Sequence, residues 1–342
     1  MTPKKQGYKM PPEWYRHQGT ILTYPQNKET FFDQLENAKN TFVEFVKIIA
    51  LEEEVYINVN DQLTRYELEQ KLEKKCVQGQ IKINVLPTND AWCRDYAPTF
   101  LKKQNSIGAT VWEFNGWGEK YPHEKDKIAG YKLAKYFADK IFRPSVILEG
   151  GAIEINSKGT LLTTKSCVLK RNKTKPQKEI EETIKEYTGA TQILWLPGGE
   201  IVGDDTDGHI DNIARFLDDN TIAVLYTKNK EDENYKTLKQ NLEFLEQLGK
   251  FNIVKIPQPS PIYYNYPWGK MRLPASYLNF YISNFAVIVP VFETKEDSTA
   301  LSILKEHFPD RLVIGIDARS ILVGQGAFHC LSQQIPYFTK TK

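Results

Sequence analysis

The sequence predicts an α/β protein in which a helix followed by a short strand recurs about five times. Three observations support this prediction. Apolar residues recur at three- and four-residue steps in several segments, as they do on the buried face of a helix. Short stretches rich in β-branched residues come after these segments, and polar loops come after the stretches. The predicted strands end near residues 86, 148, 196, 256 and 316, which is a spacing of roughly 50 to 60 residues.

The elements follow from local patterns along the chain. The first predicted helix begins at Thr30, whose hydroxyl suits an N-cap, and its apolar residues recur from Phe31 to Ile49. A strand, a second helix and another strand follow, and Pro87 ends that strand. The predicted strands are Val55–Val59, Ile81–Leu86, Val146–Leu148, Ile193–Leu196, Ile253–Ile256 and Leu312–Ile316.

The spacing of these units leaves two architectures open. Repeats of this length suit a propeller-like or solenoid fold. An ordinary open α/β sheet also alternates strands with helices. Reactive residues lie just after the predicted strands, and such residues at one end of a sheet can converge on a single pocket.

Composition and charge exclude several classes of protein. The chain of 342 residues is 41% hydrophobic and 26% charged, which is typical of a globular protein and unlike a disordered, collagen-like or coiled-coil chain. Its 45 basic and 43 acidic residues leave a formal charge of +2. We therefore expect neither nucleic acid nor a membrane surface as a partner.

The cysteines and the N-terminus indicate a reducing compartment. Cys76, Cys93, Cys167 and Cys330 form no CxxC pair, so we expect reduced thiols. The first residues lack the apolar core of a signal peptide, and the apolar stretch Phe285–Phe292 is too short to cross a bilayer. We expect a cytoplasmic protein.

A glycine-rich segment near the C-terminus, GQGAFHC, ends in Cys330. Its glycines permit a close backbone approach, so the loop could present a thiol to a ligand. A free cysteine is more often a small buried hydrophobic residue, and this segment alone leaves both interpretations open.

A second segment, GDDTDGHID, gathers acidic residues around His209. An EF-hand is excluded because Gly203 and Ala214 would occupy positions that need carboxylates. A zinc site would need ligands that no HExxH or paired-cysteine pattern supplies. If the backbone is extended here, His209 and Asp211 share one face.

Two further segments add carboxylates. Asp95 follows a strand within WCRD, where it could pair with Arg94 or cap a turn. Glu149 ends an apolar strand before two glycines, where a carboxylate needs a partner, and a histidine is the natural one. Trp92 could be core or one wall of a flat slot. A thiol, an imidazole and paired carboxylates suit a planar guanidinium cation as substrate.

The motifs together resemble the guanidine-modifying pentein superfamily, and within it the agmatine deiminase and bacterial peptidylarginine-deiminase-like family. The resemblance spans nearly the whole chain through Glu13-Trp14 with His17, WCRDYAPTF, FNGWG, EGG, LLTT, GHIDN, ASYLNFYISN and HCLSQQIP. It implies one catalytic domain over residues 1–342, built as a five-bladed β/α propeller with pseudo-fivefold symmetry. It also implies no metal or organic cofactor, and a homodimer.

The resemblance assigns a role to each reactive residue. Cys330 corresponds to the nucleophile and His209 to the general acid and base. Asp95 and Asp211 correspond to the carboxylates that bind the guanidinium, and Glu149 to the carboxylate that orients the histidine. The remaining correspondences are Trp92, beside the substrate, and Asp205, near its distal amine. The chain departs from the usual family wording at Ala97 and in GQGAFHC, which leaves the reacting groups intact.

The activity that this resemblance implies is hydrolysis of agmatine to N-carbamoylputrescine and ammonia, a step toward putrescine. The first alternative is deimination of free or peptide-bound arginine to citrulline. Amidinotransfer uses the same covalent intermediate, and a cation-binding protein that has lost its chemistry is the non-enzyme alternative.

Overall fold

A computed structural model describes residues 1–72 and 80–338. Its strands form five sheets of one pattern within these ranges, together with a two-stranded hairpin. In each of the five sheets, one strand pairs antiparallel with one neighbour and parallel with the other. Four sheets are continuous in sequence: β4 (Thr99–Lys103), β5 (Ser106–Thr110), β6 (Lys140–Phe142); β7 (Glu154–Ile155), β8 (Thr160–Thr164), β9 (Gln192–Leu196); β10 (Ala214–Phe216), β11 (Thr221–Tyr226), β12 (Asn252–Pro257); and β15 (Tyr281–Ile282), β16 (Ala286–Val291), β17 (Leu312–Asp317).

The fifth sheet joins the two ends of the chain. Its order is β18 (Ser332–Pro336), β1 (His17–Thr23), β2 (Glu54–Val59) and β3 (Ile81–Val85). Strand β18 runs antiparallel to β1, with Gln334 opposite Thr20. The segment that carries Cys330 is thereby anchored against the first strand of the protein.

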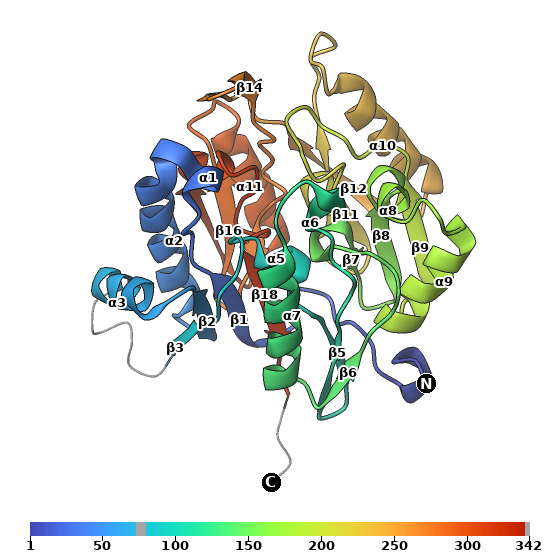
Figure 1. Ribbon diagram of the computed structural model, residues 1–342. Coiled ribbons are helices and arrows are strands. Elements are labelled where there is room, and N and C mark those ends of the chain that lie inside the picture. The colour runs from blue at the N-terminus through green and yellow to red at the C-terminus, as the bar shows by residue number, and fades with distance from the viewer. Residues whose placement is uncertain (73–79, 339–342) are drawn as a thin grey trace.

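Helices lie outside the sheets, and short turns lie near the middle of the molecule (Figure 1). The outer helices are α2 (Leu35–Ile49), α3 (Gln62–Lys71), α7 (Glu124–Phe137), α9 (Gln177–Thr188), α10 (Tyr235–Leu248) and α11 (Asp297–His307). The short ones are α1 (Lys28–Phe31), α5 (Cys93–Tyr96), α6 (Gly116–Glu119), α8 (Lys165–Arg171) and α12 (Arg319–Leu322), with 3₁₀ turns η1 (Lys4–Gln6), η2 (Phe32–Gln34), η3 (Gly150–Ala152) and η4 (Ile210–Asn212). The hairpin is β13 (Tyr263–Tyr266) with β14 (Gly269–Arg272).

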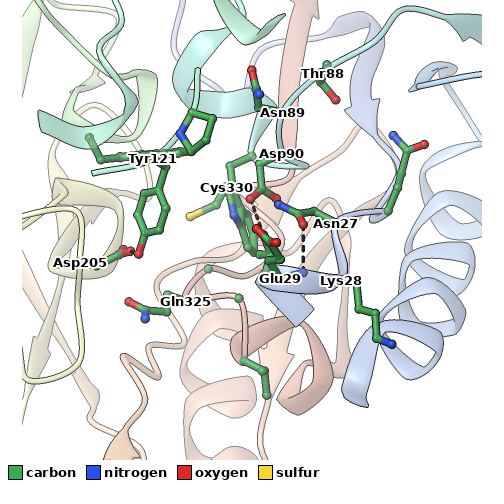
Figure 2. Close-up of a pocket in the computed structure, with 18 of the residues that line it drawn as sticks. Asn27, Lys28, Glu29, Thr88, Asn89, Asp90, Tyr121, Asp205, Gln325 and Cys330 are labelled. Atoms are coloured by element: carbon green, nitrogen blue, oxygen red, sulfur yellow. Dashed lines mark hydrogen bonds between the residues drawn. The ribbon is translucent and has the colours of Figure 1, made fainter. Parts of the chain in front are cut away.

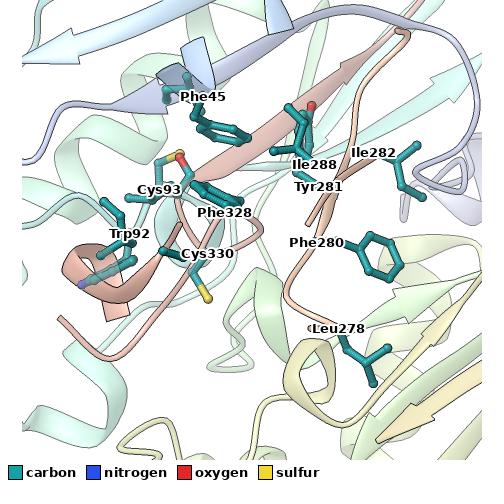
Figure 3. Close-up of a cluster of buried hydrophobic side chains, with 14 of the residues drawn as sticks. Phe45, Trp92, Cys93, Leu278, Phe280, Tyr281, Ile282, Ile288, Phe328 and Cys330 are labelled. Atoms are coloured by element: carbon teal, nitrogen blue, oxygen red, sulfur yellow. The ribbon is translucent and has the colours of Figure 1, made fainter. Parts of the chain in front are cut away.

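The core follows from the helical periodicity that the sequence shows. Ala38, Phe42, Phe45 and Ile49 of α2 are all fully buried, because they share the inner face of the helix. Phe45 stacks on Phe328 with ring centroids 4.7 Å apart. This aromatic cluster packs against the loop that carries Cys330, the candidate nucleophile (Figure 3).

The predicted α/β class is confirmed, and most predicted strands are found as β2, β3, β9, β12 and β17. The strand predicted at Val146–Leu148 is wrong. Only an isolated parallel bridge between Ile147 and Glu113 forms there, and Val146 and Leu148 fill a core cluster instead of pairing along a strand. The predicted N-cap at Thr30 is also wrong. Asn27 caps α1 by accepting from the backbone N–H of Glu29, and the Thr30 hydroxyl donates to Asp90.

No helix within residues 1–72 and 80–338 combines the length and the apolar character needed to cross a bilayer. Cys93, Cys167 and Cys330 are free and buried thiols, as predicted, and Cys76 lies outside the described residues.

Candidate active site

A cavity of about 500 Å³ opens where the loops of several sheets meet. Cys330 lies at its base, between Tyr121 with Asp205 on one side and Asn27 with Asp90 on the other (Figure 2). Three of the four reactive segments that the sequence singles out line the cavity, namely those that contain Trp92, Asp205 and Cys330. The fourth, at Glu149, is fully buried behind the cavity wall and supports residues of the site.

The glycines of the Cys330 loop let its backbone lie flat against an indole. A Cβ at Gly326 would approach the Trp92 ring to 2.5 Å, and one at Gly324 would approach it to 2.7 Å. Neither distance is sterically allowed, so only glycine permits this approach. The Cys330 sulfur points away from the Phe45 and Phe328 rings (Figure 3).

The thiol of Cys330 is held by polar neighbours. Its Sγ lies 3.1 Å from Nδ2 of Asn279, which donates to it, and 3.6 Å from Oδ2 of Asp211. Burial raises the pKa of Cys330 well above its usual value, and the negative charges of Asp211 and Asp95 raise it further. The protonated thiol is therefore the stable form until a cation enters the site.

Three predicted site residues converge around Gly151. A Cβ at this glycine would lie 2.6 Å from Nδ1 of His209 and 3.0 Å from oxygens of both Asp211 and Asp95. These side chains come from α5 and from the segment around η4, which are far apart in sequence. The missing side chain at Gly151 is what allows an imidazole and two carboxylates to lie this close together.

His209 lies fully buried between two carboxylates. Its Nδ1 is 3.7 Å from Oδ1 of Asp95, and its Nε2 is 3.5 Å from Oε2 of Glu149. Neither ring nitrogen has a hydrogen-bond partner among the residues that the structure describes. Burial opposes a charge on the ring, but Asp95 and its other anionic neighbours raise the pKa of His209 well above its usual value. The ring is therefore a cationic proton donor in this state.

The extended backbone considered for His209 and Asp211 is wrong. Residues Ile210–Asn212 form the 3₁₀ turn η4, and His209, the residue before this turn, has extended backbone angles. Both side chains nevertheless reach Gly151, because the tight turn brings Asp211 back toward the same point.

Asp95 faces the site and does not pair with Arg94. Its Oδ2 accepts from the indole N–H of Trp117 at 2.8 Å, and its Oδ1 accepts from the backbone N–H of Gly151 at 2.9 Å. Arg94 donates instead to Gln334 at 2.7 Å, on the opposite side of α5. Burial raises the pKa of Asp95 above its usual value. A cation bound beside Asp95 would offset the free-energy cost of burying the ionised carboxylate.

The two carboxylate oxygens of Asp211 differ in their hydrogen bonding. Oδ2 lies 2.7 Å from Nδ1 of His329, whereas the buried Oδ1 has no hydrogen-bond partner within the described ranges. Burial alone would raise the pKa of Asp211, but His329 lowers it below its usual value. An ionised oxygen without a partner is a ready acceptor for a guanidinium N–H.

Glu149 is held between a cation and the histidine. Its Oε1 accepts from Nε of Arg171 at 2.6 Å, and its Oε2 accepts from the thiol of Cys167 at 3.4 Å and faces His209. Burial alone would raise the pKa of Glu149, but His209 and Arg171 lower it. The structure thus brings together the glutamate and the histidine that the sequence paired.

Trp92 and Asp205 also line the cavity. Asp205 accepts from the hydroxyl of Tyr121 at 2.7 Å, and burial raises the pKa of Asp205 to about 6. Asp90 also lines the cavity, and burial raises its pKa to about 6 as well. Both carboxyl groups would be stabilised in the charged form by an ammonium group placed between them.

Among residues 1–72 and 80–338, two groups of side chains offer donor atoms that could hold a metal ion. Each group has its atoms within 4.8 Å of one another. Arg171 lies against Glu149 in one group, and Arg215 lies against Glu154 in the other. Since an arginine already balances a carboxylate in each group, neither resembles an open zinc site. The groups are Glu149, Cys167 and His209, and Glu13, Glu154 and His329.

Sequence reasoning missed several residues of the site. Trp117, which donates to Asp95, has a positive φ of 58°, a strained conformation that the FNGWG motif only hints at. Asn279 and His329 contact Cys330 or Asp211 and lie within the motifs ASYLNFYISN and HCLSQQIP, but no site role is predicted for either residue. Cys167 lies in α8 beside Glu149. No local pattern marks these contacts, because each depends on two distant segments.

Comparisons with known proteins agree with this geometry. The family model for Porphyromonas-type peptidyl-arginine deiminase matches residues 9–336. A Legionella pneumophila protein with the provisional name agmatine deiminase is 35% identical over 345 residues, covering 98% of this chain and 96% of that protein.

Two solved structures share the fold over nearly all of each chain. A C. jejuni agmatine deiminase with a cysteine-to-serine substitution and bound substrate is 33% identical, with a TM-score of 0.88 and 97% of both chains covered. A Porphyromonas gingivalis structure with the provisional name arginine deiminase is also 33% identical, with a TM-score of 0.88, covering 96% of this chain and 98% of that chain.

Proposed function

Because this chain belongs to the Porphyromonas-type peptidyl-arginine deiminase family, we propose that it is a hydrolase of amidine C–N bonds that converts agmatine and water to N-carbamoylputrescine and ammonia. The observation that carries the proposal is the arrangement around Cys330. Its sulfur lies 3.6 Å from Asp211, and Asp211 and Asp95 both reach Gly151. A thiol between two buried carboxylates suits attack on a planar cation.

The first half of the reaction forms a covalent bond. The guanidinium binds between Asp95 and Asp211, and its positive charge lowers the pKa of the Cys330 thiol, which releases its proton to solvent. The thiolate attacks the central carbon to give a tetrahedral adduct. His209, already protonated, donates its proton to the departing amine, the C–N bond breaks, and ammonia leaves. An S-alkylthiouronium remains on Cys330.

The second half regenerates the enzyme. Neutral His209 takes a proton from water, and the resulting hydroxide attacks the thiouronium carbon. The C–S bond breaks with Cys330 as the leaving thiolate, and the urea-type product loses its O–H proton to solvent and departs. The Cys330 thiolate then takes up a proton from solvent, which restores the resting thiol. Glu149 orients the imidazole in both halves of the reaction. The hydrogen bond that Arg171 donates to Glu149 at 2.6 Å supports that role.

Agmatine is preferred because acidic side chains line two opposite sides of the cavity (Figure 2). Asp90 and Asp205 are half-buried carboxyl groups that face the cavity without a lysine or arginine on their side-chain oxygens among the described contacts. We assign Asp205 to the distal amine and Trp92 to the wall along the substrate.

Deimination of arginine is the second candidate, and the P. gingivalis structure supports keeping it. An α-carboxylate would need a basic partner. Arg16, Lys120 and Arg272 do not line the cavity, and Arg272 is paired with Asp232. Lys28 and Lys125 do line it, so they are the residues that an arginine substrate would use.

The test is an ammonia-release assay on agmatine, free arginine and a blocked arginine peptide, measured side by side on the same preparation. Agmatine should give the highest kcat/KM. A higher value for either arginine compound would transfer the proposal to that substrate. Citrulline or N-carbamoylputrescine is identified in each reaction, and added glycine or ornithine reveals any amidinotransfer.

We further propose that the five sheets close into a five-bladed propeller within one catalytic domain over residues 1–342. The shared strand pattern of the sheets supports this, as does the pairing of β18 with β1. Family resemblance also leads us to propose a cytoplasmic homodimer that works without a cofactor.

A further inference from the structure

A chain of buried ionisable side chains lies beneath Cys330 and runs away from the substrate cavity. His329 is its middle member, with 1% of its surface exposed. Nδ1 of His329 lies 2.7 Å from Oδ2 of Asp211, and Nε2 lies 2.9 Å from Oε2 of Glu13. One imidazole thus bridges a carboxylate of the site to a carboxylate from the N-terminal segment.

Glu13 is a fixed anchor for this bridge. Its Oε1 accepts from the backbone N–H of Ile282 at 2.9 Å. Its Oε2 is also 3.1 Å from Nη2 of Arg215 and 3.5 Å from Nη2 of Arg94. Burial alone would raise the pKa of Glu13, but Arg215 and His329 lower it well below its usual value. A carboxylate with this many donors keeps its position when the cavity is filled.

The bridge determines which way His329 donates. Ionised carboxylates accept hydrogen bonds and cannot donate them, so the imidazole donates from both nitrogens and carries a positive charge. The Asp211 end of the bridge differs from the Glu13 end, because Oδ1 of Asp211 has no partner within residues 1–72 and 80–338. The carboxylate is therefore held by one oxygen only.

We propose that His329 is a positioning residue for guanidinium binding: anchored on Glu13, it holds Oδ2 of Asp211 and thereby presents Oδ1 to the substrate cation. This inference rests on the proposed function and adds a residue that does not touch the substrate. Without the hydrogen bond to Nδ1, Asp211 would be free to turn about its side-chain torsions, and the paired grip on the guanidinium would be lost.

Two substitutions of His329 separate positioning from charge. In His329→Asn the amide lies near the place of Nδ1 and keeps a donor for Asp211. In His329→Gln the amide reaches the place of Nε2 and keeps a donor for Glu13. Both variants lose the positive charge and one hydrogen bond, so they are matched controls for each other.

The readout is the alkylation rate of Cys330 by two small reagents, followed by peptide mass spectrometry. The reagents are 2-chloroacetamidine, which is cationic and planar, and 2-chloroacetamide, which is neutral. The rate constant for 2-chloroacetamidine is divided by that for 2-chloroacetamide, and this ratio is divided by the same ratio for free cysteine. The result measures how strongly the site favours an amidinium cation, and it does not require turnover. Thermal unfolding of each variant checks that it is folded.

We expect the wild type to favour the amidinium and His329→Gln to lose about tenfold or more of that preference, the scale of one hydrogen bond to a charged group. His329→Asn should keep the preference within about threefold. In turnover, His329→Gln should raise KM for agmatine more than His329→Asn does.

Several results would overturn the inference. They are equal losses in the two variants, a His329→Gln preference within twofold of wild type, or a wild type that shows no preference. If His329→Gln does not fold, a tenfold loss in folded His329→Asn overturns it, and retention within threefold supports it. Failure of the proposed function looks different: wild type would favour the amidinium and yet release no ammonia from agmatine.

Discussion

Sγ of Cys330 lies 3.6 Å from Oδ2 of Asp211, so the proposed nucleophile and a carboxylate proposed to bind the substrate face each other directly. Two anionic groups at this distance repel each other, and burial strengthens the repulsion. The thiol therefore holds its proton until the positive charge of the substrate arrives. His209, by contrast, is stabilised in its charged form by Asp95 and Glu149.

The first prediction concerns this protonation state. Because the pKa of Cys330 is raised, the thiolate fraction is small at neutral pH and grows as the pH rises. Alkylation of Cys330 by neutral iodoacetamide should accelerate about tenfold per pH unit between pH 7 and pH 9. Mass spectrometry of the Cys330 peptide measures the rate. A rate that is already level below pH 7 would instead indicate a stable thiolate–imidazolium pair.

The second prediction concerns the nucleophile. Cys330→Ala should abolish ammonia release, because the nucleophile is removed. Agmatine binding should be kept, because the carboxylates remain in place and the negative charge of the site is not reduced. Calorimetry measures the binding. Cys93→Ala is the matched control, since Cys93 donates to the carbonyl of Leu331 at 3.0 Å and does not line the cavity. Turnover by Cys330→Ala at the wild-type rate would remove the assignment.

The sequence predicts these residues better than it predicts their contacts. The positions of Cys330 and Glu149 stand out locally, because a thiol follows glycines and an acid follows an apolar strand. Most strands are also predictable, since β-branched runs recur after helical patterns. The bridge from Glu13 through His329 to Asp211 is not predictable in this way, because it joins three segments whose proximity only the folded chain determines. Val146–Leu148 fails for a similar reason: its apolar residues fill a core without pairing as a strand.

The third prediction concerns the grip on the cation. Asp95→Asn in a Cys330→Ala background should weaken agmatine binding about 10- to 100-fold, because one charged arm, worth about 1.5–3 kcal/mol, is lost. Asp310→Asn makes the same change at an exposed ion pair with Arg311 and should leave binding unchanged. Calorimetry on the two double variants gives the comparison, and equal affinities would remove Asp95 from the binding site.

The fourth prediction concerns the point where the side chains converge. Gly151→Ala would place a methyl group 2.6 Å from Nδ1 of His209, so the imidazole or the backbone must move. A displacement of about 1 Å in an active site can lower kcat about 100-fold, and we expect a loss of that size. The destabilisation should stay near 1–3 kcal/mol. Gly315→Ala, which meets only side-chain atoms of Val291 and Leu301, is the control, and both variants are measured by turnover and thermal unfolding.

The fifth prediction concerns the acid and base. His209→Ala should lower kcat about 100- to 10,000-fold, because both halves of the reaction need proton transfer by the imidazole. The second half should suffer more, since water is a weaker nucleophile than the thiolate and depends on the imidazole to remove its proton. The covalent adduct should therefore accumulate. Intact mass spectrometry after incubation with agmatine should reveal Cys330 heavier by agmatine minus ammonia.

The matched control for this last variant is His307→Ala at the end of α11, since His307 does not line the cavity. It should turn over agmatine at the wild-type rate and accumulate no adduct. If His209→Ala binds agmatine and forms no adduct while Cys330 still reacts with iodoacetamide, then the imidazole is needed before the thiouronium is formed. The role of His209 would then lie in expelling ammonia during the first half, and activation of water would need another base.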